Sequence, residues 1–385
     1  MDVSLFDPAQ IRLNLLPFTF TRPVADIRVG ILKISEKWAH YNFQVGYQTE
    51  SYLGKKFPSV AAGLKVNGAL CPNKDLVSTI NALKTGDRLI ANDHVLAENG
   101  EGVNDITYSG EYRLITQPWE IFGFNKEQII ADFELITHGR VSAEVTDPNT
   151  IIYGKENLFI EEGASIRAAI LNAEDGPIYI GKKAQVHEGA IIKGSFALCE
   201  SSHVNMGAKI KGDTTIGPHS KVGGEISNSV IFGFSNKGHD GFLGNSVIGE
   251  WCNLGADTNT SNLKNNYASV KLWSYGTGRF ADTGLQFCGL MMGDHAKCGI
   301  NTMFNTGTVV GVGANIFGAG FPRNFVPSYA WGGANGFTTF QLRKFYEVAE
   351  AVMKRRGIDL DDSERETLST IFTETASYRV WENKA

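Results

Sequence analysis

The chain has 385 residues, 42% of them hydrophobic, and a formal net charge of −5. This length and apolar content are enough for two or three packed domains. The negative charge and the lack of a long basic run argue against nucleic acid as a partner. No stretch approaches the roughly 20 apolar residues of a membrane helix, so we expect no membrane partner. Met1–Asp7 lacks a basic residue, and we expect no signal peptide.

The cysteines favour a cytoplasmic protein with reduced thiols. They are scattered, odd in number and without CxxC spacing: Cys71, Cys199, Cys252, Cys288 and Cys298. A disulfide framework or a structural zinc site uses paired or clustered cysteines. We therefore expect no disulfide and no bound structural metal.

Residues 1–140 alternate short apolar runs with helical segments, which is typical of a small α/β domain. Leu64–Leu70 and Arg88–Ile90 are expected to be strands. Asp75–Lys84 and Ile129–Leu135 have the apolar spacing of helices.

From residue 151 onward the apolar pattern has a period of six. Its most regular part consists of Ile180, Val186, Ile192, Leu198, Val204, Ile210, Ile216 and Val222. This period fits neither an amphipathic helix nor a half-buried strand. It is typical of a parallel β-helix, in which one aliphatic side chain per short strand points inward. We predict such a coil over residues 151–320, with Val309–Gly320 as its last turn.

The repeat is interrupted after Val222. We expect the register to slip by two residues there, with inward positions at Val230, Asn236 and Phe242, and later at Ile248, Leu254 and Thr260. Residues 261–291 are expected to leave the coil as a loop. Residues 338–385 have helical patterns and are predicted to cover an open end of the coil, as solenoids require.

The candidate chemistry lies where polar residues break the repeat. Residues about 18 positions apart stack on neighbouring coils, so His239 and Asp257 are predicted to share a corner. An imidazole beside an orienting carboxylate can act as a general base near neutral pH. For Asp257, a purely structural corner hydrogen bond is the alternative.

The stretch from His239 to Asn262 resembles the acetyltransferase half of the bacterial bifunctional enzymes that acetylate glucosamine 1-phosphate and then couple it to UTP. The matching pattern is a histidine, then Asn253-Leu254-Gly255-Ala256, then an asparagine that opens a loop. The resemblance implies His239 as the catalytic base, Asn253, Phe242 and Lys211 as acceptor-binding residues, and Ala256 and Asn262 as acyl-CoA-binding residues. Phe242 replaces a family tyrosine, and Lys209 or Lys211 stands in for a family arginine.

That resemblance also implies a left-handed coil and a homotrimer with acyl-transfer sites between subunits. Acetyl-CoA or another acyl-CoA would be the co-substrate.

The N-terminal segment resembles the start of sugar nucleotidyltransferases, through Arg12-Leu13, Pro17-Phe18-Thr19 and Arg22-Pro23. The resemblance implies nucleotide contacts by Arg12, Arg22, Asn67 and Gly68. Arginine forks match phosphate oxygens, although ordinary ion pairs are an open alternative. The family's glycine-rich loop is missing before Arg12, and Ala69 cannot replace its magnesium-binding aspartate. We therefore expect a reduced domain that needs Mg²⁺ only if it is active.

These observations predict an α/β domain, a left-handed parallel β-helix and a helical cap, forming a transferase of sugar-nucleotide metabolism. The favoured reaction is acyl transfer from an acyl-CoA to a sugar phosphate or nucleotide sugar, with His239 as base. One alternative is a nucleotidyltransferase that joins a nucleoside triphosphate to a sugar 1-phosphate. Another is a non-catalytic trimeric scaffold that binds a sugar nucleotide.

Overall fold

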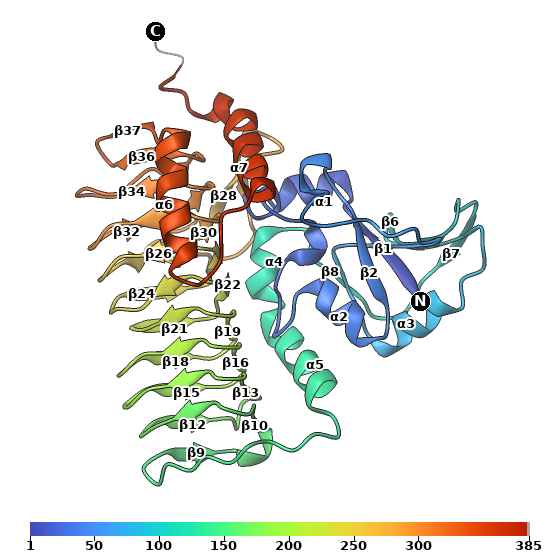
Figure 1. Cartoon of the computed structure of the whole chain (residues 1–385), viewed down its shortest axis with the longest axis horizontal. Helices are drawn as coiled ribbons and strands as arrows, with labels where there is room; N and C mark the ends of the chain where they lie inside the picture. The colour runs from blue at the N-terminus through green and yellow to red at the C-terminus, as the bar shows by residue number, and fades with distance from the viewer. Residues whose placement is uncertain (383–385) are drawn as a thin grey trace.

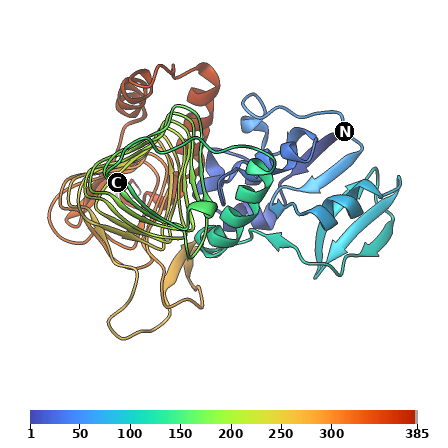
Figure 2. The ribbon, with the colours of Figure 1, turned by 90° about the horizontal axis from the view of Figure 1, so that it is seen from below.

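The computed structural model describes residues 1–382 and has three parts: an α/β domain, a parallel β-helix and two C-terminal helices (Figure 1). The predicted fold class is confirmed. Figure 2 looks along the β-helix and shows its coils superimposed, with the α/β domain on one side. No helix within residues 1–382 is both long and apolar enough to cross a bilayer.

The N-terminal domain is built on a six-stranded sheet in the order β2-β1-β3-β6-β5-β7. Its strands are β1 (Asp2–Phe6), β2 (Gln44–Gln48), β3 (Leu64–Asn67), β4 (Leu70–Cys71), β5 (Asp87–Ala91), β6 (His94–Asn99), β7 (Asn104–Thr107) and β8 (Arg113–Leu114). Its helices are α1 (Ala9–Asn14), α2 (Ile34–His40), α3 (Lys74–Asn81), α4 (Pro118–Gly123) and α5 (Asn125–Thr137). The predicted strands and both predicted helices are present. Helix α3 begins where the Asn73 side chain accepts a hydrogen bond from the Leu76 amide at 2.8 Å.

Each coil of the β-helix visits three faces in turn. The docked face, against which the N-terminal domain packs, contains β10 (Leu158–Ile160), β13 (Ile178–Ile180), β16 (Phe196–Leu198), β19 (Thr214–Ile216), β22 (Val230–Gly233), β25 (Val247–Glu250), β30 (Met291–Met292), β33 (Val309–Val310) and β35 (Phe325–Val326). The second face contains β11 (Ser165–Ile166), β14 (Gln185–Val186), β17 (His203–Val204), β20 (Lys221–Val222), β23 (Asn236–Lys237), β26 (Asn253–Leu254), β31 (Lys297–Cys298), β34 (Asn315–Ile316), β36 (Ala330–Gly333) and β37 (Gly336–Thr339).

The third face contains β9 (Ile151–Tyr153), β12 (Ile170–Asn172), β15 (Ile191–Lys193), β18 (Lys209–Lys211), β21 (Glu225–Ser227) and β24 (Phe242–Gly244), followed by the separate pair β27 (Asn259–Thr260) and β32 (Met303–Phe304). The coil-to-coil pairings on all three faces are parallel, as in β15 with β18. All eight aliphatic residues of the regular repeat between Ile180 and Val222 are at most 2% exposed. The period-six pattern is therefore the inner column of the coil, as predicted.

The predicted register directly after Val222 is wrong by one residue. Val222 lies opposite Lys237, and Ile226 lies opposite Leu243. The inward residues are therefore Ile231, Lys237 and Leu243. The predicted Val230, Asn236 and Phe242 each precede the inward residue by one position. The coil from Val222 to Lys237 is shorter than the regular coil from Val204 to Val222, because its corners are tighter.

The chain leaves the coil after β27, as predicted, and forms the hairpin of β28 (Lys271–Ser274) and β29 (Arg279–Asp282). The prediction that Val309–Gly320 is the last coil is wrong, because β35 pairs with β33 and β36 pairs with β34. These later strands lack the strict six-residue spacing. The C-terminal helices are α6 (Leu342–Lys354) and α7 (Asp362–Glu374).

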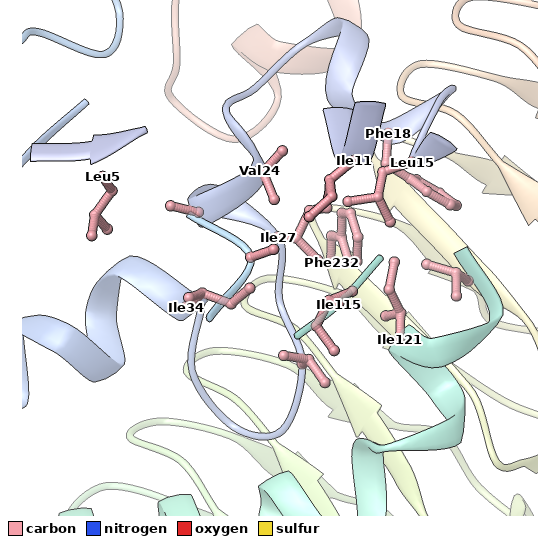
Figure 3. Packing of buried hydrophobic residues seen from close by; sticks show 14 of the residues in the cluster. Leu5, Ile11, Leu15, Phe18, Val24, Ile27, Ile34, Ile115, Ile121 and Phe232 are labelled. Atoms are coloured by element: carbon pink, nitrogen blue, oxygen red, sulfur yellow. The ribbon is translucent and has the colours of Figure 1, made fainter. Parts of the chain in front are cut away.

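One hydrophobic cluster joins the N-terminal domain to the docked face. In Figure 3 the Phe232 side chain of β22 lies among Ile11, Leu15 and Ile115 of the N-terminal domain. The rings of Phe18 and Phe232 are 5.3 Å apart. Shared apolar burial of this kind gives the two parts a continuous core.

Candidate functional site

His239 lies at the corner where the second face turns into the third face, between β23 and β24. Both His239 and its neighbour Asp240 are exposed. The corner borders an open cavity of about 460 Å³ that is lined by His187, Asn205, Met206, Gly223, Gly224, Gly238, His239 and Asp240. An accessible imidazole over a cavity is the arrangement that a general base requires.

Two side chains hold this corner in place. The Nζ atom of Lys237, inside the coil, donates hydrogen bonds to the backbone oxygens of His239 at 2.6 Å and Asp240 at 2.8 Å. Burial lowers the pKa of Lys237 to about 8. From two coils earlier in the β-helix, Asn205 Nδ2 donates to the Gly238 carbonyl at 2.7 Å. Sequence reasoning missed Lys237 because the predicted register placed Asn236 inward.

His239 and Asp257 share a corner on neighbouring coils, as predicted, but Asp257 is in register with Asp240 and not with His239. The local coil is shorter than the regular one, since Asn236 pairs with Asn253. The Asp257 amide therefore donates to the Asp240 carbonyl at 3.0 Å, and the Asp257 carboxylate accepts from Asn259 Nδ2 at 3.2 Å. These contacts agree with the alternative role of Asp257, a structural hydrogen bond at the corner. Asp240, adjacent to His239 in sequence, is a carboxylate at this corner that the sequence patterns did not predict.

The three predicted acceptor-binding residues lie on both sides of the corner. Asn253 is exposed on the second face. Phe242 starts the third face, where its amide donates to Asn259 Oδ1 at 2.9 Å. Lys211 is exposed on the third face and forms an ion pair with Glu225 at 2.7 Å. Within one chain these side chains do not converge on one point.

The two predicted acyl-CoA-binding residues are also separated. Ala256 lies on the same corner as His239, one coil further along, and its carbonyl accepts from the Asn301 amide at 2.8 Å. Asn262 lies at the other end of the third face, where its Nδ2 donates to Asn245 Oδ1 at 2.8 Å. The structure thus brings Ala256, but not Asn262, close to the corner of His239.

In the N-terminal domain, Arg12 is paired with groups of its own chain. Its guanidinium lies 3.2 Å from Asp7 and 3.4 Å from Glu50, and it donates to the Tyr52 hydroxyl at 2.9 Å. Helix α1 directly follows β1 in place of a glycine-rich loop. These contacts occupy the group that was expected to contact a nucleotide.

Arg22 is likewise occupied, and its partners come from the β-helix. It is 3% exposed, forms an ion pair with Asp294, lies 3.3 Å from Glu250 and covers the ring of Phe232. Burial alone would lower the pKa of Arg22, but the charges of Asp294 and Glu250 hold it above its usual range. The ion-pair alternative for both arginines agrees with the structure.

Asn67 and Gly68 also serve the backbone. Asn67 Nδ2 donates to the Val95 carbonyl at 2.9 Å, and its Oδ1 accepts from the Ala69 amide at 3.0 Å. A Cβ atom on Gly68 would lie 3.0 Å from the Phe6 carbonyl oxygen. No group of three or more potential metal-ligating side chains occurs in residues 1–382. With Ala69 in the aspartate position, the residues of this part do not fit a Mg²⁺ site.

Comparison with known proteins supports the two resemblances. Residues 3–141 match the family model described as sugar nucleotidyl transferase. A bifunctional sugar-1-phosphate nucleotidylyltransferase/acetyltransferase of Sulfurisphaera tokodaii is 27% identical over 257 residues, which are 64% of this chain and 55% of that protein. The bifunctional protein GlmU of Methanocaldococcus jannaschii is 28% identical over 62% of this chain and 51% of its own length.

Among solved structures, the UDP-N-acetylglucosamine acyltransferase of Francisella novicida aligns with 62% of this chain and 77% of its own, at 15% identity and a TM-score of 0.27. The chain spans about half the length of the curated relatives it matches. Residues 3–141 thus resemble sugar nucleotidyl transferases, and the chain is similar to bifunctional nucleotidylyltransferase/acetyltransferases, as the sequence motifs predicted.

Proposed function

We propose that this protein transfers an acyl group from an acyl-CoA to a sugar phosphate or nucleotide sugar, with His239 as general base. The observation that carries the proposal is the exposed imidazole on a cavity of about 460 Å³ at a corner of the β-helix. The similarity to proteins named as sugar-1-phosphate nucleotidylyltransferase/acetyltransferases supports the substrate class.

In the proposed reaction, an imidazole nitrogen of His239 takes a proton from the acceptor amine or hydroxyl as that group attacks the thioester carbonyl carbon. The carbonyl oxygen becomes an oxyanion, which backbone amides at the corner can stabilise. The tetrahedral intermediate then collapses, the carbon–sulfur bond breaks, and the imidazolium returns its proton to the leaving CoA thiolate. Asn253 is proposed to hold the acceptor, and Ala256 and Asn262 the acyl-CoA.

The separation of these residues within one chain is the reason that we also propose a homotrimer with sites between subunits. Ile151, Tyr153 and Ile191 lie on the third face and are each 48% exposed. Apolar side chains grouped on a flat sheet face are suited to packing against another copy. The predicted assembly has three times the 42.0 kDa mass of the chain, which analytical ultracentrifugation can measure.

The proposed activity is tested by incubating the protein with acetyl-CoA and a panel of amino sugars, sugar phosphates and nucleotide sugars while free thiol is measured. His239→Ala should lower turnover by about 100-fold or more, the usual range for loss of a general base. His138→Ala is a matched control, because His138 is exposed at the end of α5. Full turnover by His239→Ala would show that His239 is not the general base.

A nucleotidyltransferase is the second candidate, because residues 3–141 match that family model. The pairing of Arg12 and Arg22 with carboxylates of this chain counts against it. Pyrophosphate release from a nucleoside triphosphate and a sugar 1-phosphate would favour it over acyl transfer. Binding of a sugar nucleotide without either reaction would favour the scaffold.

A further inference from the structure

A charged residue occupies one position of the inner column of the β-helix. On the second face this column contains Val186, Val204, Val222, Lys237, Leu254, Cys298 and Ile316, each in register with the next. Lys237 is 1% exposed. The period-six repeat would place an aliphatic side chain here, as it does in the coils directly before and after.

The buried ammonium of Lys237 is not part of an ion pair. Within residues 1–382, no carboxylate lies within 4.0 Å of the Lys237 ammonium. A buried charge without a paired opposite charge costs several kcal/mol. An aliphatic side chain would serve the fold better at this position, so the ammonium calls for a role beyond packing.

The contacts of the ammonium point to that role. Its two acceptors are the carbonyl oxygens of His239 and Asp240, which belong to the peptide groups joining His239 to Asp240 and Asp240 to Gly241. The amides of Asp240 and Gly241 belong to the same two groups. Within residues 1–382 neither amide has a hydrogen-bond acceptor. A cation bound to a carbonyl polarises its peptide group and strengthens the amide as a donor.

We propose that Lys237 is a positioning residue for the acyl-transfer site: from inside the coil it fixes the His239–Gly241 corner and prepares the Asp240 and Gly241 amides to bind an oxyanion. This inference rests on the proposed function, and its test separates the two. The lowered pKa of Lys237 agrees with its burial. The titratable groups that face the ammonium are the carboxylates of Asp240 and Asp257 and the Cys298 thiol, whose pKa is raised by burial so that it stays neutral.

The test variant is Lys237→Leu, which restores the aliphatic pattern. We expect kcat to fall at least 10-fold and KM for acetyl-CoA to stay within about twofold, because oxyanion donors act mainly in the transition state. The thermal midpoint should be unchanged or higher, because an apolar side chain replaces a buried charge. A merely structural role predicts the reverse: lost stability together with lost activity.

Thr260→Val is the matched control. Thr260 also occupies an inward position and is 2% exposed, and within residues 1–382 its hydroxyl has no hydrogen-bond partner. Its replacement removes a polar atom from the column without touching the His239 corner, so kcat should stay within twofold of wild type. A pH profile adds a second readout: wild-type kcat should fall above about pH 8, and the Lys237→Leu profile should lack that limb.

The outcomes are distinguishable. If His239→Ala is inactive and Lys237→Leu has wild-type kcat, the role of Lys237 is wrong and the proposed function stands. If His239→Ala is fully active, the proposed function itself is wrong. If no acceptor in the panel is acylated, crystal structures of wild type and Lys237→Leu test whether Lys237 positions the corner. A displaced His239–Gly241 segment in Lys237→Leu supports it, and an unmoved segment overturns it.

Discussion

At the scale of single residues, the arginines that suggest nucleotide binding instead join the two parts of the molecule. Arg22 is buried against Asp294 and Glu250 of the β-helix. Both partners lie in a different domain, far along the sequence, so no local pattern could have predicted the pairing. Arg12 pairs with Asp7, five residues before it, and with Glu50 of the same domain, and the nucleotide-binding motif predicted neither partner.

Arg22→Met should destabilise the protein by about 3–5 kcal/mol, because it leaves the buried Asp294 and the half-buried Glu250 without their cation. The free energy of unfolding from urea titrations measures this. Arg88→Met is the control, since the Arg88–Asp105 pair is exposed and such pairs contribute about 0–1 kcal/mol. Equal losses in the two variants would contradict the role of Arg22 as a clamp.

The same site predicts a pH dependence of stability. Burial alone would raise the pKa of Glu250, but the charges of Arg22, Lys33 and Lys56 hold it well below the usual 4.5. A depressed carboxyl pKa gives stability that is present above about pH 4.5 and is lost as the pH falls below it. Wild-type stability should therefore decline below pH 4.5, and this decline should be weaker in Arg22→Met. If the free energy of unfolding fell equally with pH in wild type and Arg22→Met, the proposed effect of Arg22 on Glu250 would be contradicted.

At the scale of elements, the regular coils could be predicted and the shortened ones could not. Between Ile180 and Val222 every coil repeats the same spacing, so periodicity alone identified the inner column. After Val222 the corners lose residues, and a charged side chain takes an inward position at Lys237. Hydrophobic periodicity assigns only apolar residues to the inside of the coil, so it cannot identify a lysine that points inward. The shorter coil also puts Asp257 in register with Asp240, one residue away from the predicted stacking on His239.

The corner between the docked and second faces carries a column of aromatic rings. Phe234 stacks on His219 at 4.9 Å and on Trp251 at 4.3 Å, and Trp251 is followed by His295 at 6.2 Å. All four residues have positive φ, a conformation that costs about 1–3 kcal/mol for a residue other than glycine. Stacking between neighbouring coils helps to offset this cost.

Trp251→Ala should lower the free energy of unfolding by about 3–5 kcal/mol, because it removes the ring that is stacked between two others and keeps the positive φ. Trp331→Ala is the comparison, since Trp331 is 37% exposed and should cost less. Denaturant titration of both variants measures the difference. A smaller loss for Trp251→Ala than for Trp331→Ala would contradict a stabilising column.

At the scale of the whole molecule, the C-terminal helices do more than cover the coil end. The Tyr329 hydroxyl donates to the Leu368 carbonyl of α7, and Lys56 of the N-terminal domain lies 2.7 Å from Glu364. Helix α7 therefore contacts both of the other parts. The sequence predicted helices here, but their partners depend on contacts between opposite ends of the chain. We expect all three parts to unfold together in one calorimetric transition, and separate transitions would contradict this.

The third face is the proposed contact between copies of the chain. Ile191→Glu places a charge on the third face at an exposed apolar position, and should reduce the mass in solution from that of a trimer to that of the 42.0 kDa chain. Ile191→Leu is the control at the same position, because it keeps an apolar side chain on the third face and should leave the trimer intact. A wild-type protein that sediments as a monomer would exclude sites shared between subunits.

The most direct test of the central claim is the mass-spectrometric measurement of acylated acceptor formed from acetyl-CoA by wild type, His239→Ala and His138→Ala. We expect wild type and His138→Ala to form the same product at the same rate. His239→Ala should form it at least about 100-fold more slowly while keeping the wild-type thermal midpoint. Equal product formation by all three proteins would contradict the assignment of His239 as the base.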